Sequence, residues 1–161
     1  MTVHHVGVGG LAAVADPSDA LRTLALGSCV AIVMLEPVRR CVGMAHVALP
    51  DSAVNVERAI SLPGYFVDTA IPNLLEAMAS RGATDRRSLM VKLIGGASVI
   101  SASSSFDIGR RNVLAIKRIL WTRQMGAIAE DVGGKISRTV QVDAVSGRIR
   151  ISSPGREDWE I

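Results

Sequence analysis

The feature that most constrains this chain is a pair of apolar segments, residues 29–35 and 41–49, separated by a short stretch that contains Pro37. Each segment has the length of a strand, and both are far too short to span a membrane. A proline in a short connection between two such segments is typical of a turn. The sequence therefore predicts a β-hairpin over residues 29–49.

The turn of this hairpin determines which residues face each other. If it comprises residues 36–39, with Pro37 at its second position, Cys29 lies directly opposite His46. Their Cβ atoms would then be about 4.5–5.5 Å apart. A thiol and an imidazole at that separation can form a thiolate–imidazolium pair, which makes the cysteine a nucleophile.

The same pairing places the second cysteine on the other face of the hairpin. Cys41 would face Met34, so we expect a buried, unreactive thiol and no disulfide between the two cysteines. Cys29 and His46 can also be read as ordinary core residues. A reactive pair is favoured because the predicted register places the two residues opposite each other. It is also favoured by Gly27-Ser28, just before Cys29, whose backbone N–H groups can approach a reacting carbonyl.

Further motifs follow in a fixed order along the chain. They are residues 23–30 (TLALGSCV), 43–50 (GMAHVALP), 65–72 (YFVDTAIP), 92–97 (KLIGGA), 108–112 (IGRRN) and 130–134 (EDVGG). In this order they resemble the chemoreceptor glutamine deamidase family, CheD, over residues 3–152. One departure is Ser137-Arg138, where the family has a Gly-Arg pair, and it concerns the local turn only.

The resemblance implies a function, a set of catalytic residues and partners. It implies that Cys29, His46 and Thr23 form the catalytic set and that specific glutamines of methyl-accepting chemotaxis receptors are converted to glutamate through a thioester. From the residues themselves, we expect the backbone at Gly27 and Ser28 to bind the substrate oxyanion. The family also implies a regulatory partner, the phosphatase CheC, and through it phosphorylated CheY. No metal or organic cofactor is required.

Length and composition favour a single domain. The chain has 161 residues, of which 48% are hydrophobic and only 3% aromatic, so the core must consist mainly of aliphatic residues. We expect an α+β fold in which β-sheets built from hairpins pack together and two main helices lie on the outside, as in the resembling family. The domain would cover residues 1–161, with a core over 3–152 and a tail at 154–161.

The order of the elements follows from periodicity and from turn residues. Besides the hairpin, strands are expected at 3–15, 20–26, 88–94, 128–132, 138–142 and 148–152, helices at about 66–81 and 108–125, and loops at 51–63 and 97–107. The first loop follows the strand that carries His46, so it can border a substrate. In the first helix, Pro72 predicts either a kink or a start close to that residue.

Several functional classes are disfavoured. The net charge of +3 is mild, and the basic residues lack the interleaved aromatic residues of a nucleic-acid surface, so they form a solvated face or contact an acidic protein. The Gly-x-Gly-x-x-Ala sequence at 7–12 is a weak dinucleotide motif, and Gly95-Gly96 lacks a P-loop lysine. His4 and His5 are a poor metal pair. The N-terminus resembles no secretory signal, and we expect a cytoplasmic protein.

Three alternatives to a deamidase remain open at this stage. The same site can hydrolyse glutamyl methyl esters, because a thiolate cleaves an ester more readily than an amide. Capture of the thioester by a lysine would make the protein a transglutaminase. The chain can instead act chiefly as an adaptor that docks on receptors or CheC, with catalysis secondary. A redox role is the least favoured, because no second cysteine shares a face with Cys29.

Overall fold

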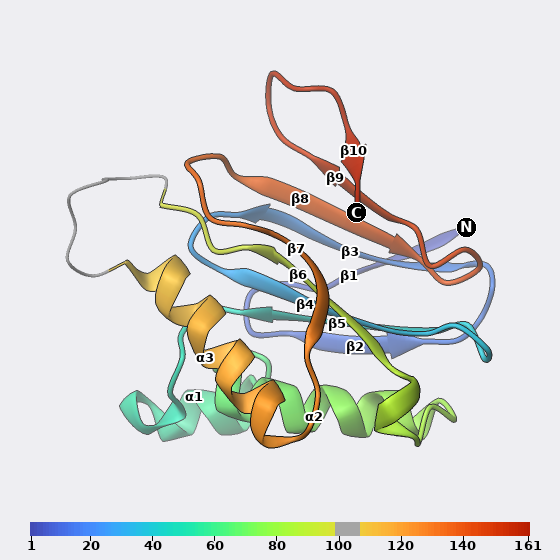
Figure 1. Cartoon of the computed structure of the whole chain (residues 1–161), viewed down its shortest axis with the longest axis horizontal. Helices are drawn as coiled ribbons and strands as arrows, with labels where there is room; N and C mark the ends of the chain where they lie inside the picture. The colour runs from blue at the N-terminus through green and yellow to red at the C-terminus, as the bar shows by residue number, and fades with distance from the viewer. Residues whose placement is uncertain (99–106) are drawn as a thin grey trace.

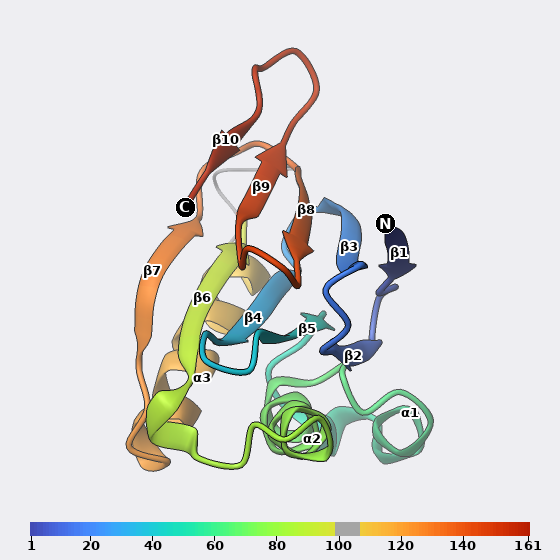
Figure 2. The ribbon, with the colours of Figure 1, turned by 90° about the vertical axis from the view of Figure 1, so that its right-hand side faces the viewer.

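The computed structural model describes residues 1–98 and 107–161 and confirms the α+β fold (Figure 1). Two five-stranded sheets lie face to face, and helices cover the free side of one of them; Figure 2 shows these layers edge-on, with α2 seen along its axis. The outer sheet has the order β1 (Thr2–His5), β3 (Asp19–Leu26), β8 (Arg138–Asp143), β9 (Ile149–Ser152), β10 (Trp159–Glu160). The middle sheet has the order β2 (Leu11–Val14), β5 (Cys41–Val47), β4 (Val30–Glu36), β6 (Met90–Gly95), β7 (Ala127–Val132).

The helical layer contains the two main helices that the sequence predicts. They are α2 (Val67–Ser80) and α3 (Ile108–Thr122), and a short helix, α1 (Val56–Ser61), accompanies them together with the 3₁₀ turns Ser52–Val54 and Arg86–Ser88. Asp107 caps α3 by accepting a hydrogen bond from the N–H of Arg110 at 3.1 Å, as expected. Pro72 lies inside α2, which begins upstream of it at Val67.

The predicted hairpin is the centre of the molecule, because both of its strands are buried at every residue. Val30, Ile32 and Met34 pack in one cluster with α2 and α3. The residues between them on β4 pack in a second cluster against the outer sheet. An apolar strand that lies between two layers has no polar face, which explains why the sequence of this hairpin is apolar throughout.

The predicted register of the hairpin is wrong by two residues. The turn comprises residues 37–40, and Glu36 pairs with Cys41. The Glu36 carboxylate accepts a hydrogen bond from the N–H of Arg39 at 2.6 Å, and Arg40 closes the turn with a φ of 55° in the left-handed region. These two features move the turn one residue along the chain from the position that Pro37 alone indicates.

Because the shift is even, it leaves every side chain on its predicted face. Ala31 now faces His46, and Cys29 lies just before the first residue of β4. Cys29 still packs toward the outer sheet, whereas Cys41 lies in the helix-side cluster with its Sγ 3.6 Å from Sδ of Met78. Both cysteines are free thiols.

Three segments differ from the expectation. The first strand at 3–15 is two strands, β1 and β2, which belong to different sheets. The loop at 51–63 contains α1, which Asn55 caps by accepting from the N–H of Arg58 at 3.0 Å. The tail at 154–161 contains β10, and Trp159 packs on the inter-sheet cluster and donates to Asp131. Most of the Ser-rich loop at 97–107 lies outside the described residues.

One glycine sets how closely α3 approaches the middle sheet. A Cβ on Gly109 would lie 2.4 Å from the carbonyl oxygen of Gly96, closer than any side chain tolerates. We therefore expect Gly109→Ala to lower the free energy of unfolding by about 1–3 kcal/mol in urea denaturation. Gly126→Ala, at a position where nothing lies within 4 Å, is the matched control and should change it by under about 1 kcal/mol. Equal stability of the two variants would contradict this close contact.

Candidate active site

A buried hydrogen bond joins the two sheets at one end of the sandwich. Thr23 on β3 and His46 on β5 are 1% and 3% exposed, and the Thr23 hydroxyl lies 2.6 Å from Nδ1 of the imidazole. A register irregularity in β3 directly follows Thr23. The backbone of His46 also bonds the loop at 7–10. Its carbonyl oxygen accepts from the N–H of Gly9, and its N–H donates to the carbonyl oxygen of Gly10.

The partners of Thr23 determine the tautomer of the histidine. The Thr23 hydroxyl donates to the carbonyl oxygen of Val6 at 2.7 Å, so its single proton is already used. Nδ1 of His46 must therefore carry a proton and donate it to the hydroxyl oxygen. Nε2 is then left with a free lone pair, and it is buried without a hydrogen-bond partner among the described residues. A buried basic nitrogen without a partner is able to accept a proton.

Cys29 lies on the same face as His46 but one step outside the β-ladder. Ala31, two residues after Cys29, pairs with His46. Diagonal neighbours on one face of an antiparallel pair have Cα atoms about 7–8 Å apart, within reach of a long side chain. The structure thus brings Cys29, His46 and Thr23 to the end of the sandwich where β3 and β5 end and β4 and α3 begin. These element ends lie at the left in Figure 1.

Burial favours the neutral forms of both His46 and Cys29. It lowers the pKa of His46 to about 4, because the imidazolium would lose its hydration. Burial also raises the pKa of the Cys29 thiol, and its own backbone N–H opposes that shift only in part. At neutral pH the resting state therefore has a protonated thiol and a neutral imidazole, and not the thiolate–imidazolium pair that the sequence suggests.

The backbone around Cys29 is anchored through its carbonyl groups. The carbonyl of Gly27 accepts from the N–H of Ala97, and that of Cys29 accepts from the N–H of Gly96, both at 2.8 Å. Within the described part of the chain, the N–H groups of Gly27 and Ser28 have no acceptor. The role of Gly27 and Ser28 as oxyanion donors stays a prediction.

The glycine pair at the end of β6 makes this anchoring possible. Gly95 has a φ of 116°, and a Cβ there would lie 2.4 Å from the carbonyl oxygen of Cys29. Only glycine allows the chain to pass that close to the segment that carries the thiol. Gly95-Gly96 is thus a packing feature of the site, in agreement with the reading of these residues as a strand end.

Sequence reasoning missed one residue at this site. Asn112 on α3 is 0% exposed and donates from Nδ2 to the carbonyl oxygens of Ser28, at 3.1 Å, and Ala48, at 3.0 Å. The available signal was its position in the motif at 108–112, on the face of α3 that otherwise presents the apolar residues Val113 and Ile116 to the core. A polar residue on such a face usually has specific partners.

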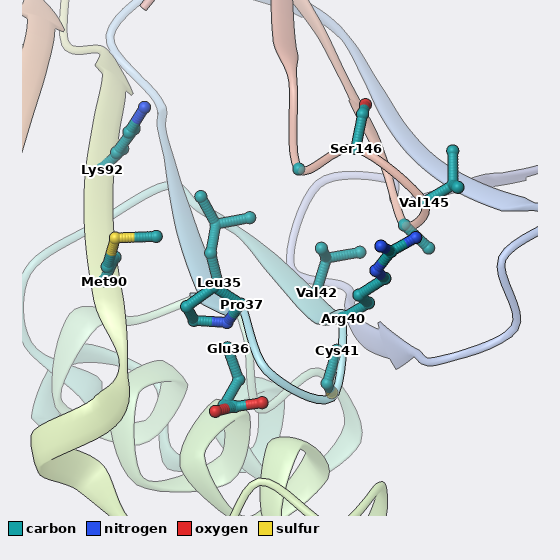
Figure 3. Close-up of a pocket in the computed structure, with 12 residues that line it drawn as sticks. Leu35, Glu36, Pro37, Arg40, Cys41, Val42, Met90, Lys92, Val145 and Ser146 are labelled. Atoms are coloured by element: carbon teal, nitrogen blue, oxygen red, sulfur yellow. The ribbon is translucent and has the colours of Figure 1, made fainter.

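Other features of the molecule lie away from this site. A hollow of about 320 Å³ lies at the turn end of the hairpin, where Leu35, Val42 and Met90 line it and Lys92 and Arg40 flank it (Figure 3). The described residues contain no group of three or more metal-ligating side chains. Within the same ranges, no helix is long and apolar enough to cross a membrane.

An α+β domain with a thiol, an imidazole and a hydroxyl near one sheet end contains the residue types that thiol hydrolases use. The comparisons with known proteins are more specific. The family model described as CheD chemotactic sensory transduction matches residues 48–153.

Curated relatives extend this match over nearly the whole chain. The "Probable chemoreceptor glutamine deamidase CheD" of Syntrophotalea carbinolica is 45% identical over 97% of both chains. "Probable chemoreceptor glutamine deamidase CheD 2" of Anaeromyxobacter dehalogenans is 44% identical over 95% of this chain and 96% of its own. The hypothetical protein YfiH of Bacillus licheniformis, a solved structure, has a TM-score of 0.47 at 10% identity, over 76% of this chain and 49% of that one. The chain belongs to the CheD family.

The neutral resting pair leads to a prediction for titration. The thiolate absorbance of Cys29, taken as wild type minus Cys29→Ser, should appear only above the ordinary cysteine pKa of about 8.5. Because the imidazole stays neutral down to about pH 4, kcat/KM should hold across neutral pH and fall only as His46 becomes protonated. A thiolate signal at neutral pH that vanishes in His46→Ala would show an ion pair instead.

The Thr23–His46 bond leads to a second prediction. Thr23→Val keeps the shape of the side chain but leaves the Nδ1–H of His46 without its acceptor, so the imidazole loses its orientation. We expect kcat to fall roughly tenfold to a hundredfold in a deamidation assay. Thr69→Val is the matched control, because the Thr69 hydroxyl on α2 donates only to backbone carbonyls, at Pro63 and Phe66, and has no side-chain partner. A similar loss in both variants would show a general effect of removing a hydroxyl.

Proposed function

We propose that this protein is a chemoreceptor glutamine deamidase, a cysteine-dependent amidohydrolase that converts specific receptor glutamines to glutamate. The observation that carries the proposal is the buried Thr23–His46 bond, which leaves Nε2 on the face that carries Cys29, with no partner in the described part of the chain. The names of the relatives, chemoreceptor glutamine deamidase CheD, support the choice of substrate.

The first half of the reaction forms a thioester. The Cys29 sulfur attacks the carbonyl carbon of the glutamine side chain while the thiol proton moves to Nε2 of His46. The negative charge that develops on the carbonyl oxygen is stabilised by backbone N–H groups at Gly27, Ser28 and Cys29, each worth roughly 3–4 kcal/mol in sites of this type. The imidazolium then protonates the amide nitrogen, the C–N bond breaks, and ammonia leaves.

The second half restores the enzyme. With ammonia gone, Nε2 of His46 removes a proton from a water molecule, which attacks the thioester carbon. The C–S bond breaks, the thiolate takes the proton back, and glutamate remains on the substrate. Thr23 accepts the Nδ1–H bond throughout and keeps the ring in one orientation, which is the task of the third residue in a catalytic triad.

The setting of the reaction is part of the proposal. Receptor glutamines lie on cytoplasmic helical segments, and both cysteines of this chain are free thiols, so we place the protein in the cytoplasm. The family resemblance adds the phosphatase CheC as a regulatory partner. Catalysis itself uses only side chains and backbone groups of this chain.

The experiment that tests the proposal is ammonia release from a purified receptor cytoplasmic fragment, with mass spectrometry of the modified residue. We expect the mass gain of glutamine-to-glutamate conversion with the wild type and none with Cys29→Ala or His46→Ala. Cys41→Ala is the matched control and should keep full activity, since Cys41 is fully buried on the other face of the hairpin.

Each other outcome points to a different function. Activity that survives Cys29→Ala would refute the thioester mechanism. Cross-linked product would indicate a transglutaminase, and faster release of methanol from a methylated fragment would indicate an esterase. A wild type that binds the fragment without changing its mass would indicate a docking adaptor.

A further inference from the structure

Asn112 connects the two chain segments that carry the reactive side chains. Its two Nδ2 hydrogens go to the carbonyl of Ser28, the residue before Cys29, and to the carbonyl of Ala48, two residues after His46. An amide NH₂ has two donors, so this side chain uses its full donor capacity on these two segments. The opposite amide orientation would place Oδ1 against two carbonyl oxygens, so the contacts also determine how the amide is turned.

The connection lies where the β-ladder has ended. The last pair between β4 and β5 joins Val30 to Val47, and beyond it the two strands no longer bond each other. Cys29 lies past that pair, and its own carbonyl bonds away from β5, to the N–H of Gly96. Among the described residues, Asn112 is what bridges the two strand ends at this point.

The contact with Ser28 also fixes the direction of an N–H group. In a trans peptide the C=O and the N–H point in opposite directions, and the carbonyl of Ser28 shares its peptide plane with the N–H of Cys29. When Asn112 holds that carbonyl, the N–H of Cys29 is aimed to the other side. This N–H acts on the Cys29 thiol itself and lowers its pKa against the effect of burial, so it lies at the reacting atom.

The arrangement is not the one that stability alone would favour. Asn112 is fully buried, yet within residues 1–98 and 107–161 its Oδ1 has no hydrogen-bond partner. A buried acceptor without a partner is unfavourable, and an apolar side chain on this core-facing side of α3 would avoid the cost. The helix also needs Gly109 to approach the Gly96 turn closely enough for the amide to reach both carbonyls.

We propose that Asn112 is a positioning residue of the deamidation site, which holds the Cys29 segment against the end of β5 and aims the Cys29 N–H as an oxyanion donor. This role rests on the proposed function, because it serves the Cys29–His46 reaction. It predicts that the loss of Asn112 affects the chemical step more than the binding of the substrate.

The test combines a loss variant with a pH-dependent rescue. Asn112→Ala should lower kcat on the receptor fragment about a hundredfold with little change in KM, the size of effect that misplacement of a reacting group produces. Asn112→Asp presents a carboxylate to two carbonyl oxygens at neutral pH, but its protonated form regains one donor. Its kcat relative to Asn112→Ala should therefore rise as the pH falls.

A control on the same helix separates positioning from folding. Ile116 is fully buried one turn further along α3, so Ile116→Ala should lose at least as much stability as Asn112→Ala while keeping most of its kcat. If kcat falls equally in both variants, or if Asn112→Asp shows no recovery in acid relative to Asn112→Ala, the proposal is overturned.

A second readout does not depend on the substrate. The alkylation rate of Cys29 by iodoacetamide should fall about tenfold in Asn112→Ala, since the thiol is no longer held beside its base. An unchanged alkylation rate would contradict the positioning role. Absence of ammonia release from the wild type would refute the proposed function alone, because the alkylation experiment would still report on Asn112.

Discussion

The burial of the β4–β5 hairpin on both faces is the constraint on which the rest of this structure depends. Every residue of both strands is buried, so the hairpin requires a sheet on one side and helices on the other. Apart from Glu36 and His46, its two strands carry no polar side chain. The side chains of the proposed site lie where the hairpin opens, at Cys29 and His46, and there the outer sheet contributes Thr23 and the helical layer contributes Asn112. The site is therefore assembled from all three layers.

The same burial determines the chemistry. An imidazole between two sheets cannot keep a charge without hydration or a carboxylate partner, and its partner here is a neutral hydroxyl. This explains why the pKa of His46 falls to about 4 and why the thiol stays protonated at rest. In the proposed mechanism, reactivity then depends on geometry, because the thiol proton must move to His46 while the substrate is bound. Interactions that set the position of Cys29 consequently matter more than those that would set its charge.

Much of the fold and of the site could be predicted from the sequence, and the failures have physical causes. The faces of Cys29 and Cys41 follow from a period of two, which survives an even shift in register. The register itself depends on Arg40, which adopts a left-handed φ. A glycine at this position would have indicated such a backbone conformation, whereas an arginine does not. The role of Asn112 was not predicted, because its partners are the backbone carbonyls of Ser28 and Ala48. These residues are distant in sequence, and a backbone acceptor produces no recognisable sequence motif. The helix α1 was not predicted, because none of its residues is buried and its sequence therefore lacks an apolar helical periodicity.

The acidity of the buried imidazolium bears on which bond the site is suited to break. An amide nitrogen leaves as ammonia only if it is protonated, whereas the alkoxide of an ester departs with less assistance. Once His46 has taken the thiol proton, the environment that lowers its pKa to about 4 makes it a strong donor toward that nitrogen. A histidine paired with a carboxylate would hold the proton more firmly. In the proposed mechanism, the neutral Thr23 partner thus favours amide cleavage, in which the transfer of the proton to the leaving group is the demanding step.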